Sequence, residues 1–165
     1  MNSRVFRIVA APLAIAMLMA AAPAKASPQS SVTAGGAVEL PAEFGEFAGD
    51  HVQVHVTARQ GPDGSAQGRF SIVHQRPPGL WARASGIVTC LAVSGDQAVV
   101  TGVITHGNLR EGGDVSGDIA TFTLSDRPEG DAAGFAFSFW GIPIVPCKPL
   151  PTFLTWSQGN ITVHE

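Results

Sequence analysis

The sequence GIVTCLAVSGDQAVVTGVI, residues 86–104, decides the fold, because it places two apolar runs on either side of a short polar turn at residues 94–97. A Gly-Asp pair between two such runs is typical of a β-hairpin. The first arm of this hairpin carries Cys90, one of two cysteines in the chain. The rest of the chain is expected to add further strands beside the hairpin.

The first 26 residues have the pattern of a secretory signal peptide. Arg4 and Arg7 precede an apolar run from residue 8 to about residue 22, and Ala24-Lys25-Ala26 follows as a small-x-small cleavage site. An uncleaved membrane anchor is the alternative, but the apolar run is shorter than the ~20 residues that span a bilayer. We therefore expect a secreted, extracellular protein that has no membrane span after signal cleavage.

Charge and length narrow the class of the mature chain, residues 27–165. Cleavage leaves seven basic and 13 acidic residues, a net charge of −6, in a chain of 139 residues. Nucleic-acid binding draws on clustered Lys and Arg, so no nucleic-acid partner is expected. The length suits one domain with a single core. Residues 27–36, which are small and polar, are predicted to be a flexible N-terminal arm, and residues 37–165 a single β-domain.

Two cysteines in an exported chain most simply form one disulfide. A bond between Cys90 and Cys147 closes a loop of nearly 60 residues. In the chain-entropy model such a bond stabilises the fold by about 4 kcal/mol. The alternative, a reactive or metal-binding thiol, needs a setting that lowers the thiol pKa or a CxxC spacing, and the sequence has neither.

Residues 51–59 and 67–75 alternate between apolar and polar side chains, which indicates two half-buried strands joined by the turn at residues 61–64. The pairing that keeps both apolar faces on the same side sets these residues opposite one another: Val56 and Phe70, Val54 and Ile72, and Val52 and His74. His74 is therefore expected to point inward near the end of its strand.

Further strands are predicted at residues 37–40, 80–93, 98–105, 118–124, 135–140 and 160–164. Alternation fails at Cys90-Leu91, which indicates a β-bulge or burial on both faces. Residues 41–49, which contain Phe44 and Phe47, form either one helical turn or a loop that plugs a barrel end. Four prolines in residues 141–151 exclude a central strand and predict an extended strap over the domain surface, held by Cys147.

Sequential strands with short turns and without amphipathic helices predict an all-β fold. Their order fits an antiparallel up-and-down barrel of about eight strands, whose closure removes exposed sheet edges. A two-sheet β-sandwich is the alternative, because the number of strands does not separate the two architectures.

The hairpin sequence VTCLAVSG at residues 88–95, followed by Ala98 and Gly102-Val103, resembles a pattern found in small secreted actinobacterial β-rich proteins of no assigned function. The resemblance continues through residues 122–126 and covers roughly residues 67–139. It implies a small exported β-domain, and it brings no catalytic or ligand residues to this chain.

The sequence predicts no metal, no cofactor and no catalytic residue. His51 and His55 lie ~13 Å apart if they belong to one strand, so they are interpreted as part of a solvated face. Glu111, Asp114 and Asp118 could supply oxygen ligands for Ca²⁺, but their spacing is not that of an EF-hand. The chain has no Gly-x-Ser-x-Gly elbow for a serine nucleophile.

The candidate ligand-binding residues are His74, Trp81, Trp140 and Phe70. A barrel of about eight strands holds one small ligand if side chains do not fill its interior. The leading hypothesis is a non-enzymatic domain that binds a small apolar molecule or a surface protein. An extracellular barrel-type enzyme, a cyclase or isomerase with His74 as the general base, is the main alternative, and a structural cell-envelope protein with an exposed patch near Trp81 or Trp140 is the third.

Overall fold

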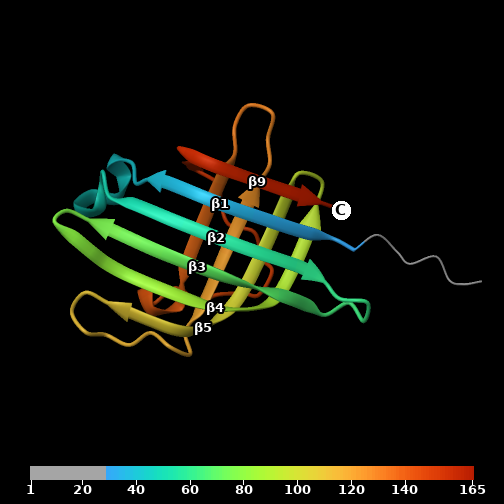
Figure 1. The fold of residues 1–165 in the computed structure, drawn as a ribbon, viewed down its shortest axis with the longest axis horizontal. Coiled ribbons are helices and arrows are strands. Elements are labelled where there is room, and N and C mark those ends of the chain that lie inside the picture. Colours follow the sequence, from blue (N-terminus) through green and yellow to red (C-terminus); the bar gives the residue numbers. More distant parts are fainter. Residues whose placement is uncertain (1–28) are drawn as a thin grey trace, which may run out of the picture.

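The computed structural model describes residues 29–165, which form one antiparallel sheet of nine strands (Figure 1). The predicted signal peptide lies outside these residues. The strands are β1 (Ser31–Glu39), β2 (His51–Gln60), β3 (Ala66–Arg76), β4 (Gly79–Ser94), β5 (Gln97–Leu109), β6 (Ile119–Ser125), β7 (Ala132–Phe137), β8 (Leu154–Thr155) and β9 (Gln158–His164). Two short 3₁₀ helices complete the fold: η1 (Ala42–Phe47) and η2 (Ser138–Trp140).

The sheet order is β8-β7-β6-β5-β4-β3-β2-β1-β9, so almost every strand pairs with its neighbours in sequence. This confirms the all-β antiparallel prediction, with the sheet curled into a half-barrel. In Figure 1 the strands β1, β2 and β3 form a front layer, and β6 and β7 pass behind them in a steeply different direction. No helix within residues 29–165 is both long enough and apolar enough to cross a membrane.

Strands β4 and β5 belong to both layers because they bend between them. Their pairing shifts register between Ser85 and Gly86 and again between Val88 and Cys90, which confirms the predicted irregularity near Cys90. A bulge inserts an extra residue and bends its strand. A Cβ on Gly86 would lie 2.4 Å from Cζ of Phe70, so the missing side chain lets the Phe70 ring rest on bare backbone at the bend.

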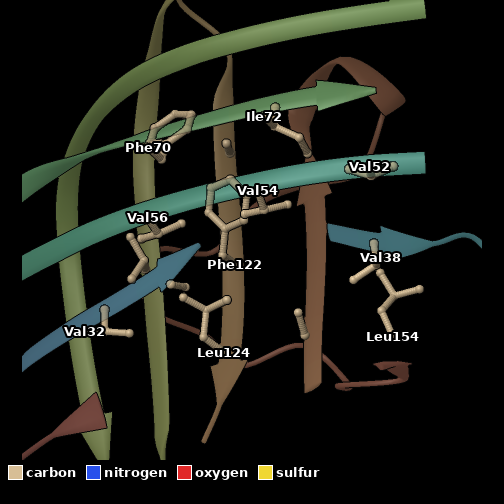
Figure 2. Packing of buried hydrophobic residues seen from close by; sticks show 14 of the residues in the cluster. Val32, Val38, Val52, Val54, Val56, Phe70, Ile72, Phe122, Leu124 and Leu154 are labelled. Carbon is tan, nitrogen blue, oxygen red and sulfur yellow. The ribbon is translucent and has the colours of Figure 1, made fainter. Parts of the chain in front are cut away.

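The core lies between the two layers and is made of the inward faces of the strands (Figure 2). Phe70 and Phe122 meet there with ring centroids 5.3 Å apart, and both side chains are buried. The predicted register is confirmed, since Val56 pairs with Phe70 and Val52 pairs with His74. The tight turn of the 86–104 hairpin is confirmed as well, with Ser94 paired to Gln97 around Gly95 at a φ of 60°.

Residues 141–151 contain no strand and cross the outer face of β5 and β6. The predicted disulfide joins Cys147 of this strap to Cys90 of β4, with 5.8 Å between the two Cα atoms. The Cys147 backbone N–H donates to Thr101 Oγ1 at 3.0 Å, and the Leu150 N–H donates to Thr123 Oγ1 at 2.8 Å. The outward-facing threonines beneath the strap are therefore buried and hydrogen-bonded.

Two carboxylates connect the edge strand β9 to the β6–β7 hairpin. The Ile161 backbone N–H donates to Asp131 Oδ2 at 2.6 Å, and the Val163 N–H donates to Asp126 Oδ2 at 3.3 Å. Free edge N–H groups are templates for pairing with another chain. The aspartates satisfy two of these groups where no backbone ladder joins β9 to β6.

Two predicted boundaries are wrong. The flexible arm at residues 27–36 was expected from small polar residues, but residues 31–36 form most of β1, which pairs with both β2 and β9. Backbone pairing on two sides orders this segment despite its composition. The predicted strand at residues 135–140 ends at Phe137, because η2 and Gly141, at a φ of 74°, turn the chain back.

Candidate functional site

One end of the half-barrel contains a cavity of about 80 Å³, here called the mouth cavity. The ends of β2, β3, β4, β5 and β7 gather there with η1 and η2. Most of the lining is apolar, and its aromatic side chains are Phe44, Phe47, Trp81, Phe135, Phe137, Phe139 and Trp140. His74 and Arg83 are the ionisable residues among those that line it.

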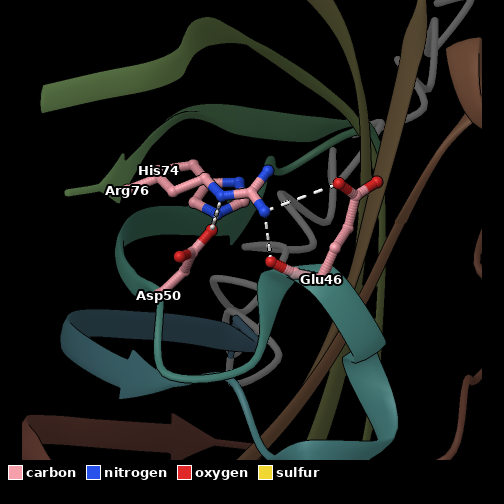
Figure 3. Close-up of polar contacts among 4 residues, drawn as sticks. All are labelled: Glu46, Asp50, His74 and Arg76. Carbon is pink, nitrogen blue, oxygen red and sulfur yellow. Dashed lines mark hydrogen bonds and ion pairs between the residues drawn. The ribbon is translucent and has the colours of Figure 1, made fainter. Parts of the chain in front are cut away.

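A hydrogen-bonded pair of a histidine and an aspartate lies at the edge of the mouth cavity (Figure 3). His74 Nε2 and Asp50 Oδ2 are 2.7 Å apart, and the two side chains are only 14% and 5% exposed. Because a carboxylate only accepts hydrogen bonds, the Nε2–H of His74 is the donor. Asp50 therefore fixes the tautomer and the orientation of the imidazole. The Arg76 Nε lies 3.9 Å from the same oxygen, so this guanidinium is a positively charged partner of the Asp50 carboxylate.

Two aromatic rings, those of Trp81 and Phe47, pack against the imidazole of His74. The Trp81 ring lies 5.0 Å from the imidazole, and the Phe47 ring lies 5.6 Å from it. Phe47 and Trp81 in turn meet edge to face at 5.0 Å, so the three rings form a compact cluster. Offset and edge-to-face pairs of this kind are favourable arrangements of aromatic rings.

The short helix η1 covers this cluster from the open end. Arg76 donates to the Glu46 backbone carbonyl (Figure 3). Its guanidinium also lies 5.0 Å from the Phe47 ring centroid, so Arg76 connects η1 to β3 through two contacts. The Phe44 ring packs against the Phe153 ring, with 5.8 Å between the two ring centroids. The two interpretations of residues 41–49, a helical turn and a plug at a barrel end, both describe this segment.

The opposite wall is formed by the end of β7 and by η2. Strict alternation along residues 135–140 would place Trp140 on the face opposite to Phe135, Phe137 and Phe139, but its ring packs edge to face on Phe137 at 4.9 Å. Alternation stops at Phe137, where the strand ends and the 3₁₀ turn of η2 brings the next side chains back. The Ser138 hydroxyl fixes this turn by donating to Asp118 Oδ1 and accepting from the Ile119 N–H. Trp140 remains 44% exposed.

The structure brings three of the four candidate ligand residues, His74, Trp81 and Trp140, to one cavity. Phe70 lies in the core instead, where Gly86 and Gly102 leave space for its ring. Sequence reasoning missed Asp50. A signal was available, because Asp50 is the next inward position before Val52 in a strand with a period of two, and Val52 was already placed opposite His74.

The acidic loop does not form a cation site. Hydrogen bonds from the Ser116 hydroxyl and backbone N–H lower the pKa of Asp114, and the Asp118 carboxylate is engaged by Ser138. Within residues 29–165, no group of three or more His, Cys, Asp or Glu side chains is arranged to hold a metal ion. His51 and His55 are both exposed on the outer face of β2.

Comparison with known proteins finds no matching protein-family model and no significant similarity to a curated protein or a solved structure. The resemblance to small secreted actinobacterial proteins therefore stays a prediction.

Proposed function

We propose that the protein is a non-enzymatic carrier or sensor that binds one small apolar molecule in the mouth cavity. The observation that carries this proposal is an aromatic cavity with one ordered polar pair at its edge, Asp50 and His74. Binding sites for small molecules are commonly apolar hollows with a few fixed polar groups. Secretion is part of the proposal and rests on the predicted signal peptide and on the disulfide.

The volume limits the size of the ligand. The cavity of about 80 Å³ exceeds the ~10–15 Å³ that one water needs, yet lies below the ~300–1,000 Å³ of pockets for drug-sized ligands. A single ring or a short alkyl group fits this range. A larger molecule would have to displace Phe44 and Phe47 on η1.

The three tryptophans allow a direct test with toluene as the probe. Trp81 and Trp140 line the cavity, whereas Trp156 is buried elsewhere, against Gly36. In ¹⁵N-labelled protein, toluene should shift the indole N–H signals of the first two and leave that of Trp156 unchanged. Equal shifts of all three signals would contradict the proposal.

A matched pair of variants, each of which replaces one alanine by leucine, sharpens this test. Ala84→Leu places extra volume in the cavity and should abolish the toluene shifts. Ala92→Leu makes the same change at an exposed position of β4 and should leave them intact. Urea unfolding of both variants checks that each remains folded. Toluene binding that survives in Ala84→Leu would exclude the mouth cavity as the site.

The Asp50–His74 pair supports a second candidate, the barrel-type enzyme. A carboxylate that holds one imidazole nitrogen leaves the other free to accept a proton, as a general base requires. The mostly apolar surroundings favour binding over catalysis. Native mass spectrometry of protein from its own culture medium separates the two: a carrier brings the same ligand with or without His74→Gln, whereas an enzyme accumulates substrate only in the variant.

A further inference from the structure

Charge is strongly segregated along this chain. Strands β2, β3, β4 and β5 contain none of the 13 Asp and Glu residues of the protein. The same four strands carry four of the five histidines, together with Arg59, Arg69, Arg76 and Arg83. A protein with an excess of acidic residues thus has one sheet region whose ionisable side chains are all basic. Such a field attracts anions to this region.

The outer face of these strands is also hollowed. An open hollow of about 740 Å³ crosses β2, β3, β4 and β5, and a second one of about 370 Å³ continues it. Ser71, Ser85 and His106 line both hollows, so they form one depression, here called the outer trough. The lining residues His55, Ser71 and Ser85 alternate with the core residues of β2, β3 and β4, so the trough lies on the face of the sheet opposite to the core. Figure 1 shows these three strands side by side.

The strand register puts complementary side chains in a row across the outer trough. His55 pairs with Ser71, Ser71 with Ser85, and Ser85 with His106. The bulge beside Gly86 and the bare backbone of Gly68 contribute to the depression. Neighbouring strands lie ~4.8 Å apart, so this row presents two hydroxyls between two imidazoles.

Two arginines mark the length of the trough. Arg69 lines the first hollow and Arg83 the second. Arg83 pairs with Val73, which is four residues from Arg69 on β3. At ~3.3 Å per residue and one strand spacing, the two Cα atoms are about 14 Å apart. Among the described residues, 29–165, no Asp or Glu lines either hollow. Asp114, which interacts with His106, is hydrogen-bonded to Ser116.

We propose that the outer trough binds an acidic oligosaccharide, with its carboxylates on Arg69 and Arg83 and its hydroxyls on the serine row. Guanidinium groups match carboxylates with two parallel hydrogen bonds. The separation of the two arginines requires an oligomer with repeated negative charges. Single-stranded nucleic acid is disfavoured, because its binding relies on exposed aromatic platforms and no Phe, Tyr or Trp side chain among the lining residues is exposed.

The test uses isothermal titration of the full protein with a hexamer of galacturonic acid. Binding is expected, and it should weaken when salt screens the charges. Each of Arg69→Ala and Arg83→Ala should weaken binding about tenfold, and the double variant about a hundredfold, as charge-assisted hydrogen bonds are lost. Arg110→Ala removes the same charge outside the trough and should bind like the wild type.

Two control ligands test whether the trough recognises the carboxylates of the oligosaccharide. The methyl-esterified hexamer keeps the hydroxyls and loses the charges, so it should not bind. Four results would each overturn the proposal. The hexamer does not bind at millimolar concentration, or the ester binds as tightly as the acid. Alternatively, Arg110→Ala loses as much affinity as the trough variants, or a thymidine hexanucleotide binds more tightly than the hexamer. Toluene binding in the mouth cavity should be the same in Arg69→Ala, because Arg69 is not among the residues that line that cavity, so the two proposed sites are tested separately.

Discussion

The outer face of the sheet carries hydroxyl side chains in two regions that differ in what covers them. Over β5 and β6, Thr101, Thr121 and Thr123 are at most 1% exposed, because the strap lies on them. Over β3 and β4, Ser71 and Ser85 border an open hollow. Hydroxyl side chains therefore hold the strap by hydrogen bonds in one region, whereas in the other region they are accessible to an external ligand.

The sheet alone therefore does not decide the role of an outward-facing hydroxyl. Beneath the strap, the Thr101 and Thr123 hydroxyls each accept a hydrogen bond from a backbone N–H of the strap, and leaving such a group without a partner costs free energy. The Thr121 hydroxyl donates to the Val100 carbonyl instead. In the outer trough no segment within residues 29–165 supplies such a cover. Basic residues surround those hydroxyls instead, which is the arrangement that an external anionic ligand needs.

The largest expected effect follows from releasing the strap. Cys90→Ala/Cys147→Ala removes a bond between residues 57 positions apart, and the free energy of unfolding should fall by about 4 kcal/mol in the chain-entropy model. Urea unfolding measures the loss. Hydrogen exchange should accelerate at the Leu150 amide, while amides at the centre of β2 and β3 keep their protection relative to global unfolding. Uniform acceleration across both regions would show that the strap and the sheet are one cooperative unit.

A smaller effect is expected from a single hydroxyl beneath the strap. Thr101→Val leaves the Cys147 N–H without its acceptor and removes the 3.1 Å contact with Thr121 Oγ1. The free energy of unfolding should fall by about 1–3 kcal/mol, which is the usual cost of an unsatisfied buried group. Thr57→Val on the exposed face of β2 is the control and should change stability by less than about 0.5 kcal/mol. Equal losses in the two variants would remove the distinction between the covered and the open region.

Much of the fold was predictable because local patterns agree with it. Alternation placed Val52, Val54 and Val56 opposite β3 in the correct register, and the two cysteines were correctly paired. The beginning of β1 was predicted to be flexible because its residues are small and polar. Backbone pairing with β2 and β9 orders this segment, and residue composition alone does not indicate such pairing.

The candidate site was only partly predictable. His74 was placed inward by alternation, but the position of Trp140 depends on a 3₁₀ turn held by Ser138 and Asp118, which are 20 residues apart. The outer trough was missed for another reason. The sequence feature that marks the trough is the absence of carboxylates from four successive strands. Between His51 and Leu109 the only acidic residues are Asp63 and Asp96, which lie in the hairpin turns. A search for motifs looks for residues that are present, so it does not find this feature.

The smallest expected effect concerns the β2–β3 turn that borders the open region. Hydrogen bonds from the Ser65 hydroxyl and backbone N–H lower the pKa of Asp63. A carboxyl whose pKa is lower in the folded than in the unfolded chain stabilises the fold above its unfolded value, ~3.9, and loses that contribution as the pH falls through the folded value.

Asp63→Asn should therefore reduce the free energy of unfolding slightly above pH 5, and the difference from the wild type should shrink toward zero at about pH 2, once the carboxyl is protonated in both states. Urea unfolding between these limits measures it. Asp96→Asn in the β4–β5 turn is the control, since among residues 29–165 its carboxylate accepts no side-chain or backbone hydrogen bond comparable to those at Asp63. A difference at Asp63 that does not change with pH would mean that Ser65 stabilises the turn equally well through an uncharged partner, so the charge itself contributes nothing there.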